Sequence, residues 1–187
     1  MNAPRLQPLA PEQMTAEQQR VAQTIAAGPR GSVRGPFVAL LRSPELADRI
    51  RALGDYVRFE SDLAPLLREL AILVVARFWS AHYEWHAHRQ AALKAGINPE
   101  IPETIAQGRR PSTLSFDEAL IHDFFSQLLN RRDVTDDTYR AAVERFGEKA
   151  LIELIGTAGY YSMISLVLNA NRTPAPEGGS PLPLLPT

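Results

Sequence analysis

The sequence contains no cysteine, which excludes disulfide bonds, thiolate metal ligands and cysteine nucleophiles from the chemistry of this chain. Aromatic residues make up only 7% of the 187 residues, and the net charge of −1 gives no electrostatic reason to expect nucleic acid or an acidic membrane as a partner. The longest apolar run, Leu70–Ala76, is too short to span a bilayer, and the first residues lack the apolar core of a signal peptide. We therefore expect a soluble, cytoplasmic protein.

The sequence does contain helical periodicity and N-terminal capping signals of helices. Capping boxes begin at Thr15 and Ser115, and Ser43 is a capping residue followed by proline. No segment alternates with a period of two for long enough to predict a strand. The expected fold is all-α, a compact bundle of about eight helices. We expect a break near residues 79–81, where bulky aromatics and a serine interrupt a helical run, and a helix end at Gly147.

The length suits one domain with extensions, and three parts are predicted. Residues 1–32 form an N-terminal helical extension, residues 33–172 a helical domain, and residues 173–187 a proline-rich tail or arm. The last part holds five prolines and two glycines and cannot be helical. It is either disordered or an arm that lies on a neighbouring surface.

Three of the four histidines fall within seven residues, beside a carboxylate and two aromatic side chains. Glu84 and His88 are four residues apart and so share one face of a helix. If the helix is continuous, Glu69, Arg77 and Ser80 project within about a quadrant of the same direction. A carboxylate beside an imidazole fixes its tautomer and lets the pair move a proton. A polar stripe in an apolar segment thus predicts a small ionisable site in an apolar cleft.

Other interpretations of these residues are open. Helical Glu–His pairs at this spacing are common on surfaces and contribute only a few tenths of a kcal/mol. Arg77 could pair with either glutamate inside an oligomer interface. His82 and His86 are also four apart, on roughly the opposite face, and suit a two-histidine metal site. That face offers no obvious third ligand, so no metal is expected, and solvent-facing or interface histidines are the alternative.

Several segments resemble the carboxymuconolactone decarboxylase family, which is related to the alkyl hydroperoxidase D-like proteins. The resemblance covers about residues 33–170. The segments are Gly35–Phe37, Leu40–Leu46, Arg68–Leu73, Ala81–His88 with Ala92 and Gly96, and Glu153–Ile155 with Tyr161 in the last helix.

The two branches of this group differ at the site. The peroxidase branch uses a Glu, a Cys-x-x-Cys motif, and a His four residues after the second Cys. Glu69 and His88 match the Glu and the His, whereas the cysteine positions fall on Ala81 and Glu84, so a thiol-dependent peroxidase is excluded. The decarboxylase branch keeps a Glu-x-x-x-His pair, which Glu84 and His88 reproduce. That branch is generally shorter and has no carboxylate at the position of Glu69.

The resemblance implies a cofactor-independent decarboxylase or related lyase that acts on a small carboxylated lactone or unsaturated acid by acid/base catalysis. In this interpretation His88 donates or accepts the proton, Glu84 orients it, and Glu69 is a second proton-transfer group. The implied substrate-binding residues are Arg77, Ser80 and Tyr161. No cofactor is expected, and the resemblance implies a homo-oligomer, as a dimer, trimer or hexamer. The alternatives are a cofactor-free isomerase or hydrolase, and a non-catalytic oligomeric protein that binds small molecules.

Overall fold

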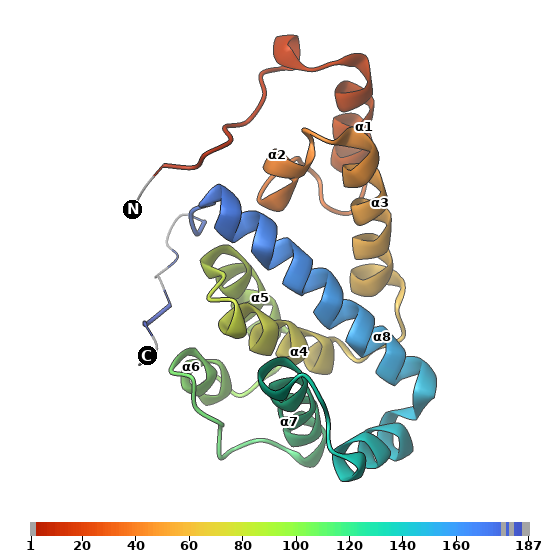
Figure 1. The fold of residues 1–187 in the computed structure, drawn as a ribbon, viewed down its shortest axis with the longest axis vertical. Helices are drawn as coiled ribbons and strands as arrows, with labels where there is room; N and C mark the ends of the chain where they lie inside the picture. Colours follow the sequence, from red (N-terminus) through yellow and green to blue (C-terminus); the bar gives the residue numbers. More distant parts are fainter. Residues whose placement is uncertain (1–2, 177–178, 180–181, 185–187) are drawn as a thin grey trace. The chain divides into compact units, whose positions relative to one another are not determined.

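The computed structural model describes residues 3–176, 179 and 182–184, and this part of the chain is helical with no strand (Figure 1). The all-α prediction is confirmed, with eight α-helices over these residues. They are α1 (Ala16–Ala27), α2 (Pro36–Leu40), α3 (Pro44–Asp55), α4 (Pro65–Phe78), α5 (His82–Lys94), α6 (Glu100–Ala106), α7 (Phe116–Arg131) and α8 (Asp136–Asn171), with a 3₁₀ helix η1 (Pro11–Gln13) and a π-helix η2 (Tyr56–Glu60).

One compact unit comprises the described part of Met1–Ser61 together with Leu166–Pro174. Within it, α1, α2 and η2 each contact α3. The capping box predicted at Thr15 is present, and Val21 and Ile25, one helical turn apart, are the buried residues of α1. At the other end of the unit, the side chain of Asn171 accepts a hydrogen bond from the backbone N–H of Leu6 at 2.7 Å.

The second compact unit comprises Asp62–Ser165 and the described part of Ala175–Thr187. Helix α4 is its centre, because it contacts α5, α6 and α7 (Figure 1). All nine residues from Glu69 to Arg77 are buried, which is expected of a helix that is apolar on nearly every face. Two of these nine, Glu69 and Arg77, are charged, and both therefore need an explanation.

The predicted break between α4 and α5 is confirmed. Helix α4 ends at Phe78, Ser80 has a left-handed backbone with φ of 49°, and α5 begins at His82. Because the chain reverses here, α5 packs back against α4 rather than extending it. This reversal lets residues 19 positions apart in sequence meet side by side.

Helix α8 is interrupted at Gly147, whose φ of 80° and ψ of 158° are not helical. This agrees with the helix end predicted there. The most apolar stretch of α8 meets the length and composition of a membrane span, and half of that stretch is buried inside the protein. The core helix of a soluble protein passes the same test of length and composition.

Three short elements were not expected from the sequence, namely the 3₁₀ helix η1, helix α2 and the π-helix η2. The division into parts 1–32, 33–172 and 173–187 stays a prediction. Of the predicted tail, residues 177–178, 180–181 and 185–187 lie outside the described residues.

Candidate active site

A buried imidazole lies between two carboxylates in the second unit. His88 Nδ1 is 2.6 Å from Glu69 Oε2, and His88 Nε2 is 3.1 Å from Glu84 Oε2. The three residues are between 3% and 5% exposed. We call this cluster of Glu69, His88 and Glu84 the relay. The structure thus brings together the three residues that the sequence analysis named as catalytic candidates.

Two local features build the relay. Glu84 and His88 lie one turn apart on α5, so their side chains meet on one face of that helix. Glu69 comes from α4, and the reversal after Phe78 brings it to the opposite nitrogen of the ring. The Glu69 contact is the shorter of the two, so Glu69 holds the ring at least as firmly as Glu84 does.

The relay favours a charged imidazole. Burial by itself lowers the pKa of His88, but the hydrogen bonds that Glu69 and Glu84 accept from the ring, together with their negative charges, outweigh burial and raise the pKa above its ordinary value of 6.5. An imidazolium donates from both ring nitrogens and therefore satisfies both carboxylates at once. Burying these charges is tolerable only because they are paired and hydrogen-bonded.

Two further residues border the relay. Tyr161, from α8, packs edge-on against His88 with ring centroids 4.7 Å apart, which places this predicted residue at the site. Arg68 was not among the predicted site residues, and its Nε lies 3.9 Å from Glu69 Oε1. Its position beside Glu69 in the sequence was the available signal, because a cation next to a buried carboxylate helps to keep that carboxylate ionised.

Arg77 and Ser80 lie in a separate cluster. Arg77 donates to Ser80 Oγ at 3.5 Å and to the carbonyl oxygen of Pro183 at 2.9 Å. The backbone N–H of Leu182 donates to His82 Nδ1 at 3.0 Å, so described residues of the predicted arm lie against the start of α5. The single stripe expected for a continuous helix is therefore divided, because the helix ends before Ser80.

The guanidinium of Arg77 is buried, with the residue 4% exposed, and it makes no ion pair with any described carboxylate. Burial lowers the pKa of Arg77, although arginine stays charged in proteins. Burial and the nearby charge of Arg77 also lower the pKa of His82, which suits a neutral ring that accepts the Leu182 hydrogen bond. Within the described part of the chain, no group of three His, Asp or Glu residues is arranged to hold a metal ion.

Comparisons with known proteins agree with this fold. The profile of the carboxymuconolactone decarboxylase family matches residues 44–111, the segment that contains the whole relay. An uncharacterized peroxidase-related protein from Silicibacter sp. TM1040 has a similar structure, with a TM-score of 0.75 and 18% identity over 94% of this chain and 92% of that one.

A second solved structure, an alkylhydroperoxidase AhpD core described as an uncharacterized peroxidase-related protein from Ralstonia eutropha JMP134, has a TM-score of 0.77 and 13% identity over 95% of this chain and 94% of that one. At these identities the two structures show a shared fold. A search of curated proteins found no match.

Proposed function

Through residues 44–111 the chain belongs to the carboxymuconolactone decarboxylase family, and from this premise we propose that it is a cofactor-independent carboxy-lyase. Its proposed substrate is a small carboxylated lactone or unsaturated acid. The family includes decarboxylases and peroxidases. A thiol-dependent peroxidase needs a thiolate to attack the peroxide, and this chain has no cysteine to supply one. The two glutamates and the histidine at the site are suited to acid/base chemistry.

The observation that supports this proposal is the relay. Decarboxylation breaks the bond between carbon and the leaving carboxylate, and its electron pair moves through the unsaturated lactone onto the carbonyl oxygen. Carbon dioxide leaves, and a carbon of the electron-rich intermediate must then take up one proton to complete the reaction. In the proposed step His88 passes the proton on Nε2 to Glu84, which delivers it to the carbon. Glu69 stays bonded to Nδ1, and water recharges the neutral imidazole afterwards.

Arg77 is the proposed anchor for the substrate carboxylate. A buried guanidinium that has no carboxylate partner among the described residues is suited to an anion, because the new pair would offset its desolvation. Ser80 and Tyr161 are proposed to hydrogen-bond the substrate. A homo-oligomeric assembly and a cytoplasmic location are part of the same proposal.

One observation favours a second candidate, a non-catalytic protein that binds small molecules. Both ring nitrogens of His88 are already bonded to carboxylates, an arrangement that also serves a purely structural role. Dialysed protein separates the two candidates. Release of carbon dioxide from an added substrate supports the lyase, and binding without turnover supports the alternative.

The test is a turnover screen across lactones and unsaturated carboxylic acids, with release of carbon dioxide and uptake of protons both recorded. For any substrate that is found, His88→Gln should lower turnover about a hundredfold or more, because it removes the proton that the relay stores. His86→Gln is the matched control on the same helix, since His86 is no part of the relay, and it should stay within about twofold of wild type. Full activity in a folded H88Q variant would refute the proposed role.

A further inference from the structure

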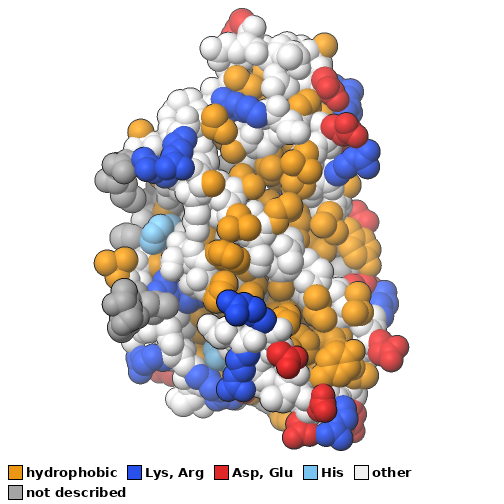
Figure 2. Space-filling view, viewed as in Figure 1, with side chains coloured by type: hydrophobic (Ala, Val, Ile, Leu, Met, Phe, Trp, Pro, Cys, Tyr) orange, Lys and Arg blue, Asp and Glu red, His pale blue; other side chains and the backbone are white. Residues whose placement is uncertain are grey.

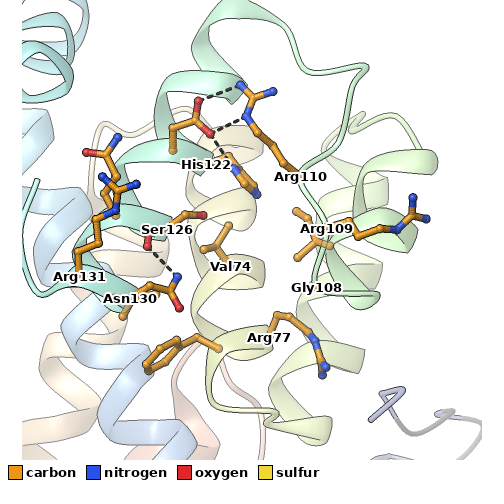
Figure 3. A pocket seen from close by; sticks show the side chains of 14 residues that line it. Val74, Arg77, Gly108, Arg109, Arg110, His122, Ser126, Asn130 and Arg131 are labelled. Carbon is orange, nitrogen blue, oxygen red and sulfur yellow. Dashed lines mark hydrogen bonds and ion pairs between the residues drawn. The ribbon is translucent and has the colours of Figure 1, made fainter. Parts of the chain in front are cut away.

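A cavity of about 690 Å³ in the second unit lies among α4, α7 and the segment that follows α6 (Figure 3). Its volume falls in the range of small-molecule sites. Glu69, Glu84 and His88 do not line it, so it is distinct from the relay. We call it the arginine pocket, because Arg77, Arg109, Arg110 and Arg131 line it.

The pocket is strongly basic. Among its lining residues Asp123 is the single carboxylate, against four arginines. The whole chain has a net charge of −1, so this excess of positive charge is a local feature and not a general property of the protein. In the space-filling view, Lys and Arg side chains gather over the region where α6 and α7 lie (Figure 2). A cavity with charge of one sign raises the local concentration of ligands of the other sign.

Three of the four arginines have no carboxylate partner among the described residues, namely Arg77, Arg109 and Arg131. Arg110 forms a bidentate ion pair with Asp123, in which Nε lies 2.7 Å from Oδ1 and Nη2 lies 2.8 Å from Oδ2. By contrast, Arg109 bonds only the neutral side chain of Gln107, and Arg131 has no hydrogen bond or ion pair within the described part of the chain. Both side chains are exposed at the pocket, so they can turn toward a ligand.

A histidine supplies a directed polar group inside the pocket. His122 is 8% exposed, and its Nδ1 lies 3.0 Å from Asp123 Oδ1. That contact fixes the ring and leaves Nε2 without a partner among the described residues. In Figure 3 the ring points from α7 toward Val74. Because Asp123 is held in turn by Arg110, the orientation of His122 is set before any ligand arrives.

Helix α7 adds polar groups along the same wall. Ser126 and Asn130 follow His122 at intervals of one turn, and both line the pocket. Apolar side chains also line the pocket, from α4 at Val74 and Phe78 and from α6 at Ile105. A cavity lined by cationic, polar and apolar side chains fits a molecule that has charged groups and a hydrocarbon part.

We propose that the arginine pocket binds a small organic molecule that carries at least two negative charges, as phosphate or carboxylate groups. Arg131 and Asn130 receive one charged group, and Arg109 with His122 receives the other. The hydrocarbon part lies against Val74 and Ile105. Guanidinium groups bind both phosphate and carboxylate in a planar, bidentate manner. The feature that the two kinds of ligand share is therefore multiple negative charge.

Calorimetric titration of the full chain with pyrophosphate and with citrate tests this proposal. At low salt we expect saturable binding of at least one probe, with a Kd below about 1 mM. Arg131→Gln should weaken that binding about tenfold, because it removes a charged hydrogen-bond donor. Arg132→Gln is the matched control, because Arg132 is the next residue in the chain and its side chain does not line the pocket. This variant should change probe binding by less than about twofold. Tighter binding of pyrophosphate indicates a phosphate ligand, and tighter binding of citrate a carboxylate ligand.

Amide spectra of the wild-type protein give an independent result if the R131Q variant does not fold. Pyrophosphate or citrate should shift the signals of His122, Ser126 and Asn130. Three outcomes would overturn the proposal: no saturable binding of either probe, equal weakening by R132Q, or shifts confined to residues outside the pocket. A change in subunit number on R131Q without probe binding would also overturn it and would make this face an interface between copies of the chain.

Discussion

At the scale of single residues, His88 is the unusual group. A buried imidazole normally loses its proton, because burial disfavours the charged form. Here two carboxylates reverse that preference, and the pKa is raised. The same contacts that stabilise the charged ring therefore create a store for one proton. Stability and the proposed chemistry depend on the same pair of hydrogen bonds.

Removing one carboxylate of the relay should destabilise the fold. Glu69→Ala leaves His88 with one buried partner, and we expect the free energy of unfolding to fall by about 3–5 kcal/mol. Glu103→Ala is the control, because Glu103 pairs with Arg89 on the surface and its removal should cost less than about 1 kcal/mol. Chemical denaturation of both variants measures the difference. Equal effects would contradict a buried, charged relay.

The pH dependence of that difference has a definite sign. The folded pKa of His88 is raised above the unfolded value of 6.5, so its stabilisation is fully present below pH 6.5 and is lost as pH rises through the folded pKa. The difference between wild type and E69A should therefore be largest between about pH 5 and 6.5, above the ordinary range of glutamate. It should shrink at higher pH. A difference that grows with pH would contradict the raised pKa.

At the scale of the elements, the path of the chain changes at two residues with a positive φ, Ser80 and Gly147. The turn at Ser80 folds α5 onto α4 and brings Glu69 to His88. Gly147 interrupts α8 with a conformation that glycine adopts almost alone. Both residues have a positive φ, but only Gly147 is a glycine, the residue that adopts this conformation without strain.

A single substitution tests the role of Gly147 in the interruption of α8. Gly147→Ala should lower the free energy of unfolding by about 1–3 kcal/mol, because alanine is strained at this φ and ψ. The added methyl group would meet no neighbouring atom, so strain alone accounts for the loss. Gly156→Ala, later in α8, is also free of clashes and is helical, so it should raise stability by about 0.5–1 kcal/mol. Effects of the same sign would refute this explanation.

Local signals explain which parts of the fold were predictable. The capping boxes at Thr15 and Ser115 and the break near Ser80 depend on residues close in sequence, and the structure confirms all three. The π-helix η2 has no comparable local signal. Within the site, the spacing of Glu84 and His88 was enough to predict that they share one face of a helix. The partner of Arg77, the carbonyl of Pro183, lies 106 positions away and follows only from the folded chain.

At the scale of the whole molecule, one fold accommodates different site chemistries. This chain shares its fold with two peroxidase-related structures at 18% and 13% identity. The resemblance drawn from the sequence puts Ala81 and Glu84 at the two cysteine positions of the peroxidase branch. In the proposed mechanism Glu84, at the second of these positions, transfers a proton, whereas the peroxidase branch has a thiol there. The site, and not the fold, therefore supports the proposed lyase.

Titration of the imidazole nitrogens by NMR tests the charged relay most directly. In protein labelled with ¹⁵N-histidine, the H88Q variant identifies the His88 signals, and the other three histidines serve as internal references. We predict that the ring titrates above 6.5, so that at pH 6.5 both nitrogens of His88 carry a proton in most molecules. A His88 that is mostly neutral and in one tautomer at pH 6.5, with a pKa at or below 6.5, would contradict the stored proton and the chemistry proposed from it.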